Sequence, residues 1–220
     1  MAIICHDQRL LFIMAPHTGC TAVGTALRDE LGGLFLPTDD IKDANGDVVV
    51  ARKHSQLGDL LSGGVLGAQE RAALTVATSV RNPFDALVSH YLKVNQRLEA
   101  DPKRREGATI AAKSFEGWLR FRFRPGVWLR IRGRQPDEVV RWTTGADVIM
   151  RHERLQDDFD QLMTRVGVGR RVVIPEVNVT GIRTTRHYQD FYTPTARALV
   201  EELYAADLAE FGYRFDPAEG

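Results

Sequence analysis

The chain has 220 residues and equal numbers of basic and acidic side chains, 29 Lys and Arg against 29 Asp and Glu, so its formal net charge is zero. Hydrophobic residues make up 44% of the chain and charged residues 26%, which excludes a largely disordered protein. Two cysteines are too few for a disulfide scaffold, and no apolar run reaches the roughly 18 residues needed to span a bilayer. Since the start of the chain also lacks the pattern of a signal peptide, we expect a cytoplasmic protein without a membrane span.

The basic side chains are unevenly distributed along the chain. Residues 97–142 carry 12 basic and 6 acidic side chains, whereas residues 1–96 carry 8 and 10. A nucleic-acid-binding protein usually has a larger basic excess, so we expect no nucleic-acid partner. The middle segment is then either a solvated basic face or part of a pocket for an anionic ligand.

Apolar residues recur either in continuous runs, which predict buried strands, or at helical spacing, which predicts helices. Glycine pairs predict where helices end, and Asn82-Pro83 and Thr193-Pro194 are typical of helix starts. The predicted elements, in chain order, are a strand at 9–16, a helix at 22–31, a strand at 47–51, a helix at 56–62, a strand at 73–80, a helix at 84–97, a charged loop at 99–107, a helix at 115–123, a strand at 146–151, and helices at 153–166 and 193–209.

The alternation of strands and helices predicts an α/β fold with a mainly parallel central sheet flanked by helices. The length, at roughly 150 residues per domain, favours a single domain over 1–220 with an elaboration. Sheets of this kind bind ligands at the carboxyl ends of their strands. Two polar turns, at 16–22 and 81–89, are expected at that edge.

The first polar turn reads Pro16-His17-Thr18-Gly19-Cys20-Thr21-Ala22. The N–H groups and the dipole of a helix that starts here would favour an anion, and the small residues would let it approach the backbone. The chain has no G-x-x-x-x-G-K-[ST] sequence, which argues against an ordinary ATPase or GTPase. Taken alone, the turn fits an anion site and a purely structural strand–helix turn about equally well.

The second polar turn combines an arginine with a hydroxyl. Arg81 ends the strand at 73–80, and Ser89 is expected on the second turn of the following helix, over the end from which Arg81 projects. An Arg fork with a hydroxyl suits a terminal phosphate. The alternative is an ion pair of Arg81 with Asp85 at the helix start, with Ser89 an ordinary helix residue.

The two turns together resemble those of the sulfotransferases that use 3′-phosphoadenosine 5′-phosphosulfate (PAPS). In that family the first turn, typically Pro-Lys-[Ser/Thr]-Gly-[Ser/Thr]-[Ser/Thr], holds the phosphosulfate, and Arg-x-Pro-x-x-x-x-x-Ser-x-Tyr binds the 3′-phosphate. Arg81, Pro83, Ser89 and Tyr91 match the second motif at full spacing. Two further stretches resemble later parts of the family, Met150 to Leu155 with Asp158-Phe159, and Tyr204 to Tyr213. The resemblance implies a P-loop-like three-layer fold and a PAPS-dependent sulfotransferase.

The resemblance also implies which residues bind PAPS and its product 3′,5′-ADP. The expected set is His17, Thr18, Gly19, Cys20, Thr21, Ala22, Arg81 and Ser89, with Arg183 or Arg186 completing the 3′-phosphate site, and with no metal. His17 stands where the family has a lysine that contacts the oxygen leaving sulfur. A protonated His17 could stabilise charge there or act as a general acid, and the alternative is that His17 marks a weakened or inactive enzyme.

Residues for the acceptor are expected near Arg52-Lys53-His54-Ser55, which resembles a Lys-His segment of carbohydrate-type members of the family. His54 would be the general base and Lys53 would bind the acceptor, a small molecule or a glycan; a surface basic cluster is the alternative. The segment 97–145 is expected to be a substrate-side insertion or lid. Its three tryptophans, Trp118, Trp128 and Trp142, suit either an aromatic floor or the core.

Two other functions remain as alternatives. One is a protein that binds PAPS or 3′,5′-ADP but no longer transfers the sulfuryl group, with His17 in the place of the lysine as the sign of this loss. The other is an atypical P-loop kinase, which would prefer ATP and require magnesium, and which the missing GK[ST] sequence disfavours.

Overall fold

The computed structural model describes residues 1–52, 55–100, 114–123, 139–177 and 186–216. Its tertiary contacts divide the chain into two compact units. Unit 1 comprises Met1–Arg81 and Val139–Asn178, and unit 2 comprises Asn82–Glu138 and Val179–Gly220. Among the described residues, no helix is both long and apolar enough to cross a membrane.

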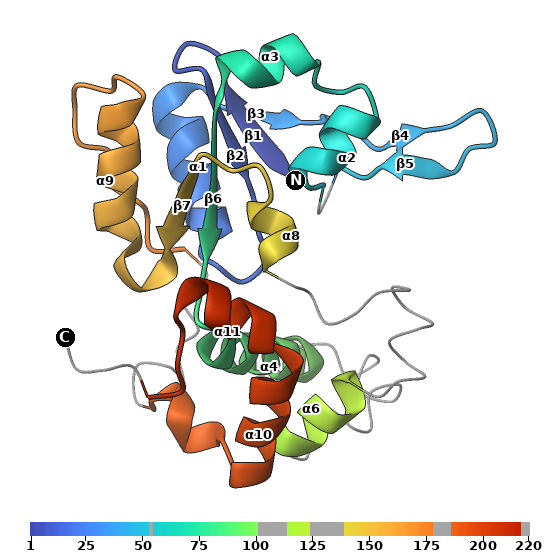
Figure 1. Cartoon of the computed structure of the whole chain (residues 1–220), viewed down its shortest axis with the longest axis vertical. Helices are drawn as coiled ribbons and strands as arrows, with labels where there is room; N and C mark the ends of the chain where they lie inside the picture. Colours follow the sequence, from blue (N-terminus) through green and yellow to red (C-terminus); the bar gives the residue numbers. More distant parts are fainter. Residues whose placement is uncertain (53–54, 101–113, 124–138, 178–185, 217–220) are drawn as a thin grey trace. The chain divides into compact units, whose positions relative to one another are not determined.

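Unit 1 is an α/β structure built on a five-stranded sheet in the order β3-β1-β2-β6-β7 (Figure 1). Its described elements are β1 (Ala2–Cys5), β2 (Leu10–Ile13), α1 (Cys20–Leu31), β3 (Leu34–Leu36), β4 (Ile41–Lys42), β5 (Val48–Val50), α2 (Leu57–Ser62), α3 (Ala68–Ala73), β6 (Thr75–Val80), α8 (Val140–Thr143), β7 (Val148–Arg151), the 3-10 helix η1 (His152–Arg154) and α9 (Leu155–Arg165). Strands β4 and β5 form a separate two-stranded hairpin.

The sheet is mixed, with a parallel half that carries the predicted turns. Strand β6 pairs in parallel with both β2 and β7, as the sequence predicts. Strand β1, which the sequence analysis did not predict, runs antiparallel to β2 and to β3. Because β2, β6 and β7 run in the same direction, their carboxyl ends lie at one edge of the sheet.

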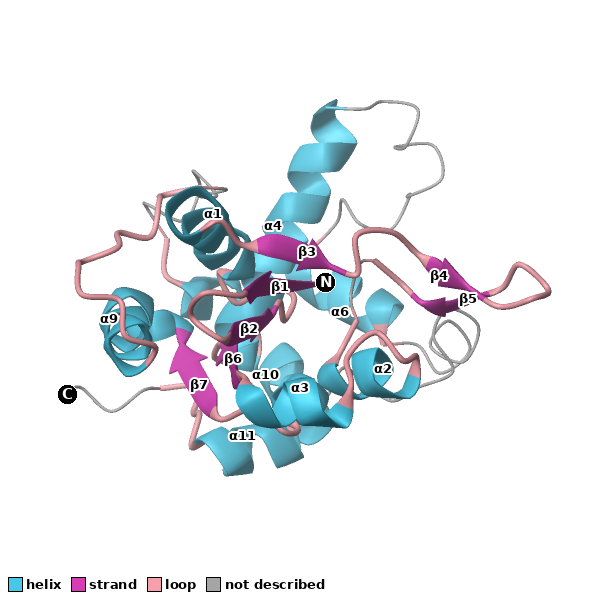
Figure 2. Cartoon of the chain, turned by 90° about the horizontal axis from the view of Figure 1, so that it is seen from above, coloured by secondary structure: helices cyan, strands magenta, loops and turns pink. Residues whose placement is uncertain are grey.

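Helices cover both faces of this sheet. Figure 2 shows α1 and α9 on one side of the strands and α2 and α3 on the other. Alternate residues of β2 supply the two cores: Leu10 and Phe12 pack with residues of α1 and α9, whereas Leu11 and Ile13 pack with residues of α2. All four side chains are at most 1% exposed, which explains why the run reads as continuously apolar in the sequence.

Unit 2 is helical in its described part. Its elements are α4 (Pro83–Ala100), α6 (Phe115–Arg122), the 3-10 helix η3 (Tyr188–Phe191), α10 (Pro194–Leu203) and α11 (Ala205–Phe211). An aromatic and aliphatic core joins them, with Phe84, Phe115 and Trp118 each at most 4% exposed. This core is separate from the two cores of unit 1, so unit 2 has its own source of stability.

The helix starts predicted at the two X-Pro pairs are confirmed. The side chain of Asn82 accepts a hydrogen bond from the Phe84 N–H at 3.1 Å, and α4 begins at Pro83. The side chain of Thr193 accepts from the Ala196 N–H at 3.1 Å, and α10 begins at Pro194. The predicted final helix is divided at Tyr204 into α10 and α11. Of the loop predicted at 99–107, the first two residues belong to α4 and the rest lies outside the described residues.

Candidate functional site

The loop between β2 and α1 contains two residues with left-handed backbone. His17 has a φ of 66° and Gly19, the N-cap of α1, has a φ of 83°. Histidine is among the side chains that adopt this conformation more often than most, and glycine adopts it without steric cost. Together they turn the chain sharply from the sheet into the helix.

The start of α1 has the properties of an anion-binding helix end. Gly19 supplies no side-chain cap, and the first turn contains no acidic residue. The first intrahelical bonds run from the Ala22 and Val23 N–H groups to the Gly19 carbonyl, at 2.9 and 3.2 Å. The N–H groups at a helix start carry partial positive charge that a phosphate or sulfate can neutralise.

Thr18 ties the loop to the sheet. Its hydroxyl donates to the Ala15 carbonyl at 2.8 Å and lies 2.7 Å from the Ser79 hydroxyl. A hydroxyl has one proton, so Ser79 must be the donor to Thr18. The Thr18 side chain is 4% exposed and its proton is already used, so Thr18 can offer a ligand its backbone rather than its hydroxyl. Thr21, by contrast, is exposed.

Arg81, directly after β6, reaches the same loop. Its Nη1 donates to the His17 carbonyl at 3.1 Å, across 64 positions of sequence, and the residue is only 6% exposed. The guanidinium is a planar, permanently charged group with five N–H donors, the kind of side chain that binds phosphate oxygens. The two turns singled out in the sequence therefore meet at the carboxyl edge of the sheet, as predicted for Arg81 and His17.

His152 is a third residue at this edge that the sequence analysis did not assign to the site. It follows β7, the next parallel strand, and packs against the loop. A Cβ atom placed on Gly19 would lie 3.0 Å from His152 Nδ1 and 2.7 Å from Leu155 Cδ2. The sequence signal that could have identified His152 is its position directly after the third parallel strand.

Ser89 lies within unit 2. It occupies the second turn of α4, as predicted from the motif, and is 4% exposed. Tyr91 of the same motif packs with its ring centroid 5.4 Å from that of Phe115. Arg186, also in unit 2, donates to the Asp190 carbonyl at 3.1 Å and stacks 4.4 Å above the Phe191 ring.

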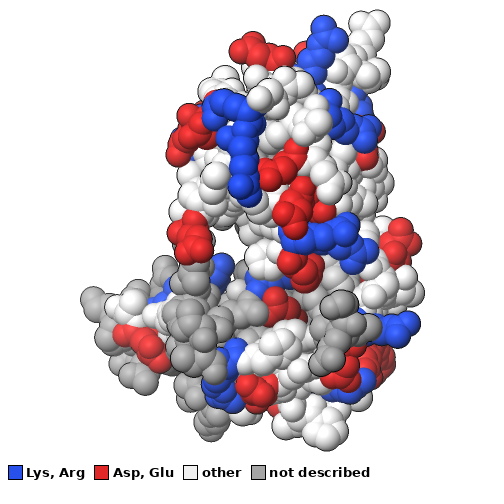
Figure 3. Space-filling model, turned by 90° about the vertical axis from the view of Figure 1, so that its left-hand side faces the viewer, with Lys and Arg blue, Asp and Glu red and all other residues white. Residues whose placement is uncertain are grey.

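Several predicted residues fall outside the described part of the chain. These are Lys53, His54 and Arg183, and most of the basic segment 97–142, including Trp128. Trp118 and Trp142 are 4% and 8% exposed, so both belong to the cores. On the face drawn in Figure 3, the described Lys and Arg side chains are interspersed with Asp and Glu.

The loop also carries Cys20, one of the two cysteines. Cys20 is half-buried at the first position of α1, whereas Cys5 is 1% exposed inside the sheet. Burial raises the pKa of the Cys5 thiol to about 11. The two thiols therefore differ in exposure, which makes Cys20 a chemical reporter of the loop.

Among the described residues, no group of three or more His, Cys, Asp or Glu side chains is arranged to hold a metal ion. Comparison of the chain with protein-family models, with curated proteins and with solved structures finds no significant match in any of the three.

Proposed function

We propose that this chain is a P-loop-like PAPS-dependent sulfotransferase. The observation that carries the proposal is the bond between Arg81 and the His17 carbonyl. It joins the two turns that resemble the PAPS-binding turns of that family, and it does so at the end of parallel strands and the start of a glycine-capped helix. An oligoanion such as PAPS matches this combination of helix N–H groups and guanidinium.

In this proposal the residues of the loop and of the second motif have separate roles. The backbone of residues 17–22 holds the phosphosulfate, with Gly19 allowing its close approach. Arg81 and Ser89 bind the 3′-phosphate, and Arg183 or Arg186 completes that site. Bound PAPS supplies the sulfuryl group. His17 donates a hydrogen bond or a proton to the oxygen that leaves sulfur, and His54 accepts the proton of the attacking hydroxyl or amine.

The acceptor is proposed to be a small molecule or a glycan, bound with the help of Lys53. A protein that binds the nucleotide without transferring sulfate is the second candidate, because His17 replaces a permanently charged lysine. The two functions share the nucleotide site and differ in turnover. An acceptor screen after binding is established separates them.

Alkylation of Cys20 tests where the nucleotide binds. Saturating 3′,5′-ADP should slow the reaction of Cys20 with N-ethylmaleimide at least tenfold, because the ligand would cover the loop at the start of α1. The rate is read by mass spectrometry of the peptide containing Cys20. Cys5 is the internal control: it is buried, and its thiol should stay unmodified with and without nucleotide.

Equal protection of Cys20 from alkylation by magnesium-ATP would instead favour the kinase. Unchanged alkylation in the presence of a nucleotide that measurably binds the protein would place the binding site elsewhere and contradict the assignment of the loop.

A further inference from the structure

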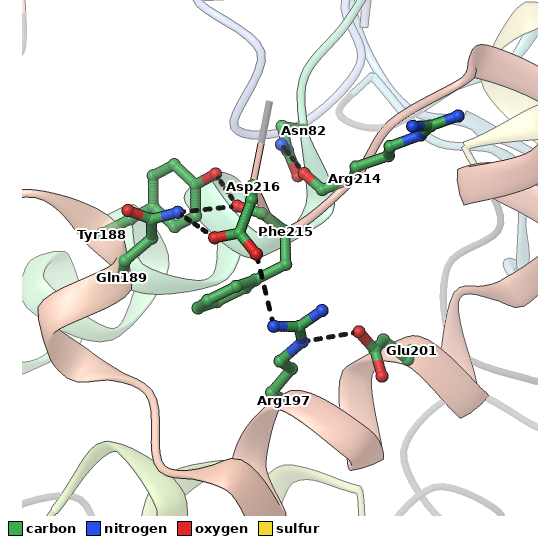
Figure 4. Close-up of polar contacts among 8 residues, drawn as sticks. All are labelled: Asn82, Tyr188, Gln189, Arg197, Glu201, Arg214, Phe215 and Asp216. Carbon is green, nitrogen blue, oxygen red and sulfur yellow. Dashed lines mark hydrogen bonds and ion pairs between the residues drawn. The ribbon is translucent and has the colours of Figure 1, made fainter. Parts of the chain in front are cut away.

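Side chains of unit 2 hold the C-terminal segment Tyr213–Asp216 at two backbone carbonyls, those of Arg214 and Phe215 (Figure 4). Asn82 Nδ2 donates to the Arg214 carbonyl at 2.9 Å. The Phe215 carbonyl accepts from the Tyr188 hydroxyl and from Gln189 Nε2, the latter at 3.1 Å. These bonds come from two separate places in the sequence, so the segment is a docked part of unit 2.

Side chains of the segment are fixed as well. The Phe215 ring lies with its centroid 5.1 Å from that of Phe84 and 5.2 Å from that of Tyr192, in edge-to-face geometry. The Arg197 guanidinium covers the Phe215 ring at 4.6 Å and pairs with Asp216 at 3.4 Å. Gln189 Nε2 donates to the other Asp216 oxygen at 2.7 Å. Phe215 thus adds one more aromatic ring to the core of unit 2.

Two of these contacts are made at the start of α4, by Asn82 directly before the helix and by Phe84 in its first turn. Asn82 uses both ends of its amide: Oδ1 caps the helix at the Phe84 N–H, and Nδ2 holds the tail at Arg214. The side chain is 5% exposed, so neither bond is readily replaced by water. Phe84, at the second position of α4, packs on Phe215. The docked tail therefore restrains the helix start from two sides.

That helix start joins the residues proposed to bind the 3′-phosphate. Arg81 is the residue before Asn82, and Ser89 lies on the second turn of the same helix. We propose that the segment Tyr213–Asp216 is a strap that positions the first turn of α4 for nucleotide binding, with Asn82 as the positioning residue that links the two. The inference rests on the proposed function of Arg81 and Ser89.

Strap docking and nucleotide binding are thermodynamically linked, so the effect of nucleotide on docking can be measured in the wild-type protein. If docking of the strap raises the affinity for nucleotide by a given factor, nucleotide must favour docking by the same factor. The bond after Arg214 is a trypsin site within the strap, and its cleavage requires undocking. We expect saturating 3′,5′-ADP to slow the release of the peptide that follows Arg214 about tenfold, measured by mass spectrometry.

Variants test the same coupling from the other direction. Asn82→Asp keeps the oxygen that caps Phe84 but replaces the donor to the Arg214 carbonyl with a second oxygen, and Phe215→Leu removes the ring. Each should weaken 3′,5′-ADP binding about tenfold and speed cleavage after Arg214 without nucleotide. Asn95→Asp, the same chemical change farther along α4, is the matched control. It should leave the affinity for 3′,5′-ADP and the rate of cleavage after Arg214 unchanged. Thermal unfolding without ligand checks that each variant is folded.

The outcomes separate this inference from the proposed function. Wild-type protein that fails to bind 3′,5′-ADP overturns the proposed function, and the strap proposal falls with it. Wild-type protein that binds 3′,5′-ADP, but whose cleavage after Arg214 is unaffected by it, overturns the strap alone, as does unchanged affinity in both variants.

Discussion

Replacing Gly19 with alanine should abolish measurable binding of 3′,5′-ADP and lower the free energy of unfolding by about 3 kcal/mol. Two causes act together. The φ of 83° is costly for any residue with a Cβ atom, and that atom would lie 2.7 Å from Leu155 Cδ2 and 3.0 Å from His152 Nδ1. Either the loop or the side chains after β7 must move, and the helix start would lose its position.

Gly32 provides a matched control at the other end of α1. Its φ is 65°, but a Cβ atom there would meet nothing within 4 Å. Gly32→Ala should therefore show the backbone cost alone, about 1 kcal/mol, and bind 3′,5′-ADP as the wild type does. Chemical denaturation and calorimetric titration measure the two effects. Gly19→Ala protein that binds nucleotide normally would contradict the role given to the loop.

Replacing Arg81 with alanine should weaken 3′,5′-ADP binding about 100-fold. The change removes the proposed partner of the 3′-phosphate and also the bond that holds the His17 carbonyl. Arg81→Lys keeps the charge but loses the planar fork, so its affinity should lie between those of the wild type and the alanine variant.

Arg28→Ala is the control for the loss of one positive charge. Arg28 is an exposed arginine on α1 whose guanidinium lies 4.7 Å above the Phe35 ring. Its removal should leave the affinity for 3′,5′-ADP within about twofold, since exposed charges are screened by solvent and salt. Equal losses of affinity in the Arg28 and Arg81 variants would indicate a general charge effect and contradict a specific 3′-phosphate site.

The parts of the fold predicted well were those with a strong local signal. Strand β2 is continuously apolar because both of its faces are covered, and the X-Pro starts of α4 and α10 carry their own capping residues. Strands β1 and β3 were not predicted. They have four and three residues, and β3 forms by pairing with β1, which is distant from it in the sequence.

The sequence has no local signal for the boundary between the two compact units. The chain passes from unit 1 to unit 2 between Arg81 and Asn82, in the middle of a motif and with no Gly- or Ser-rich linker. For the candidate site, the motifs predicted that Arg81 and the loop at His17 lie at the same edge of the sheet. The contact of His152 with Gly19 depends on β7 pairing in parallel with β6, and the hydrogen bond that the Thr18 hydroxyl accepts comes from Ser79 of β6.

Calorimetric titration of the wild-type protein with 3′,5′-ADP, 5′-ADP and ATP, with and without magnesium, tests the central claim most directly. A site built for PAPS should bind 3′,5′-ADP at least tenfold more tightly than 5′-ADP, because only the former carries the phosphate assigned to Arg81, and magnesium should not be required. Binding of ATP that equals or exceeds that of 3′,5′-ADP, and that depends on magnesium, would contradict the sulfotransferase assignment and favour a kinase.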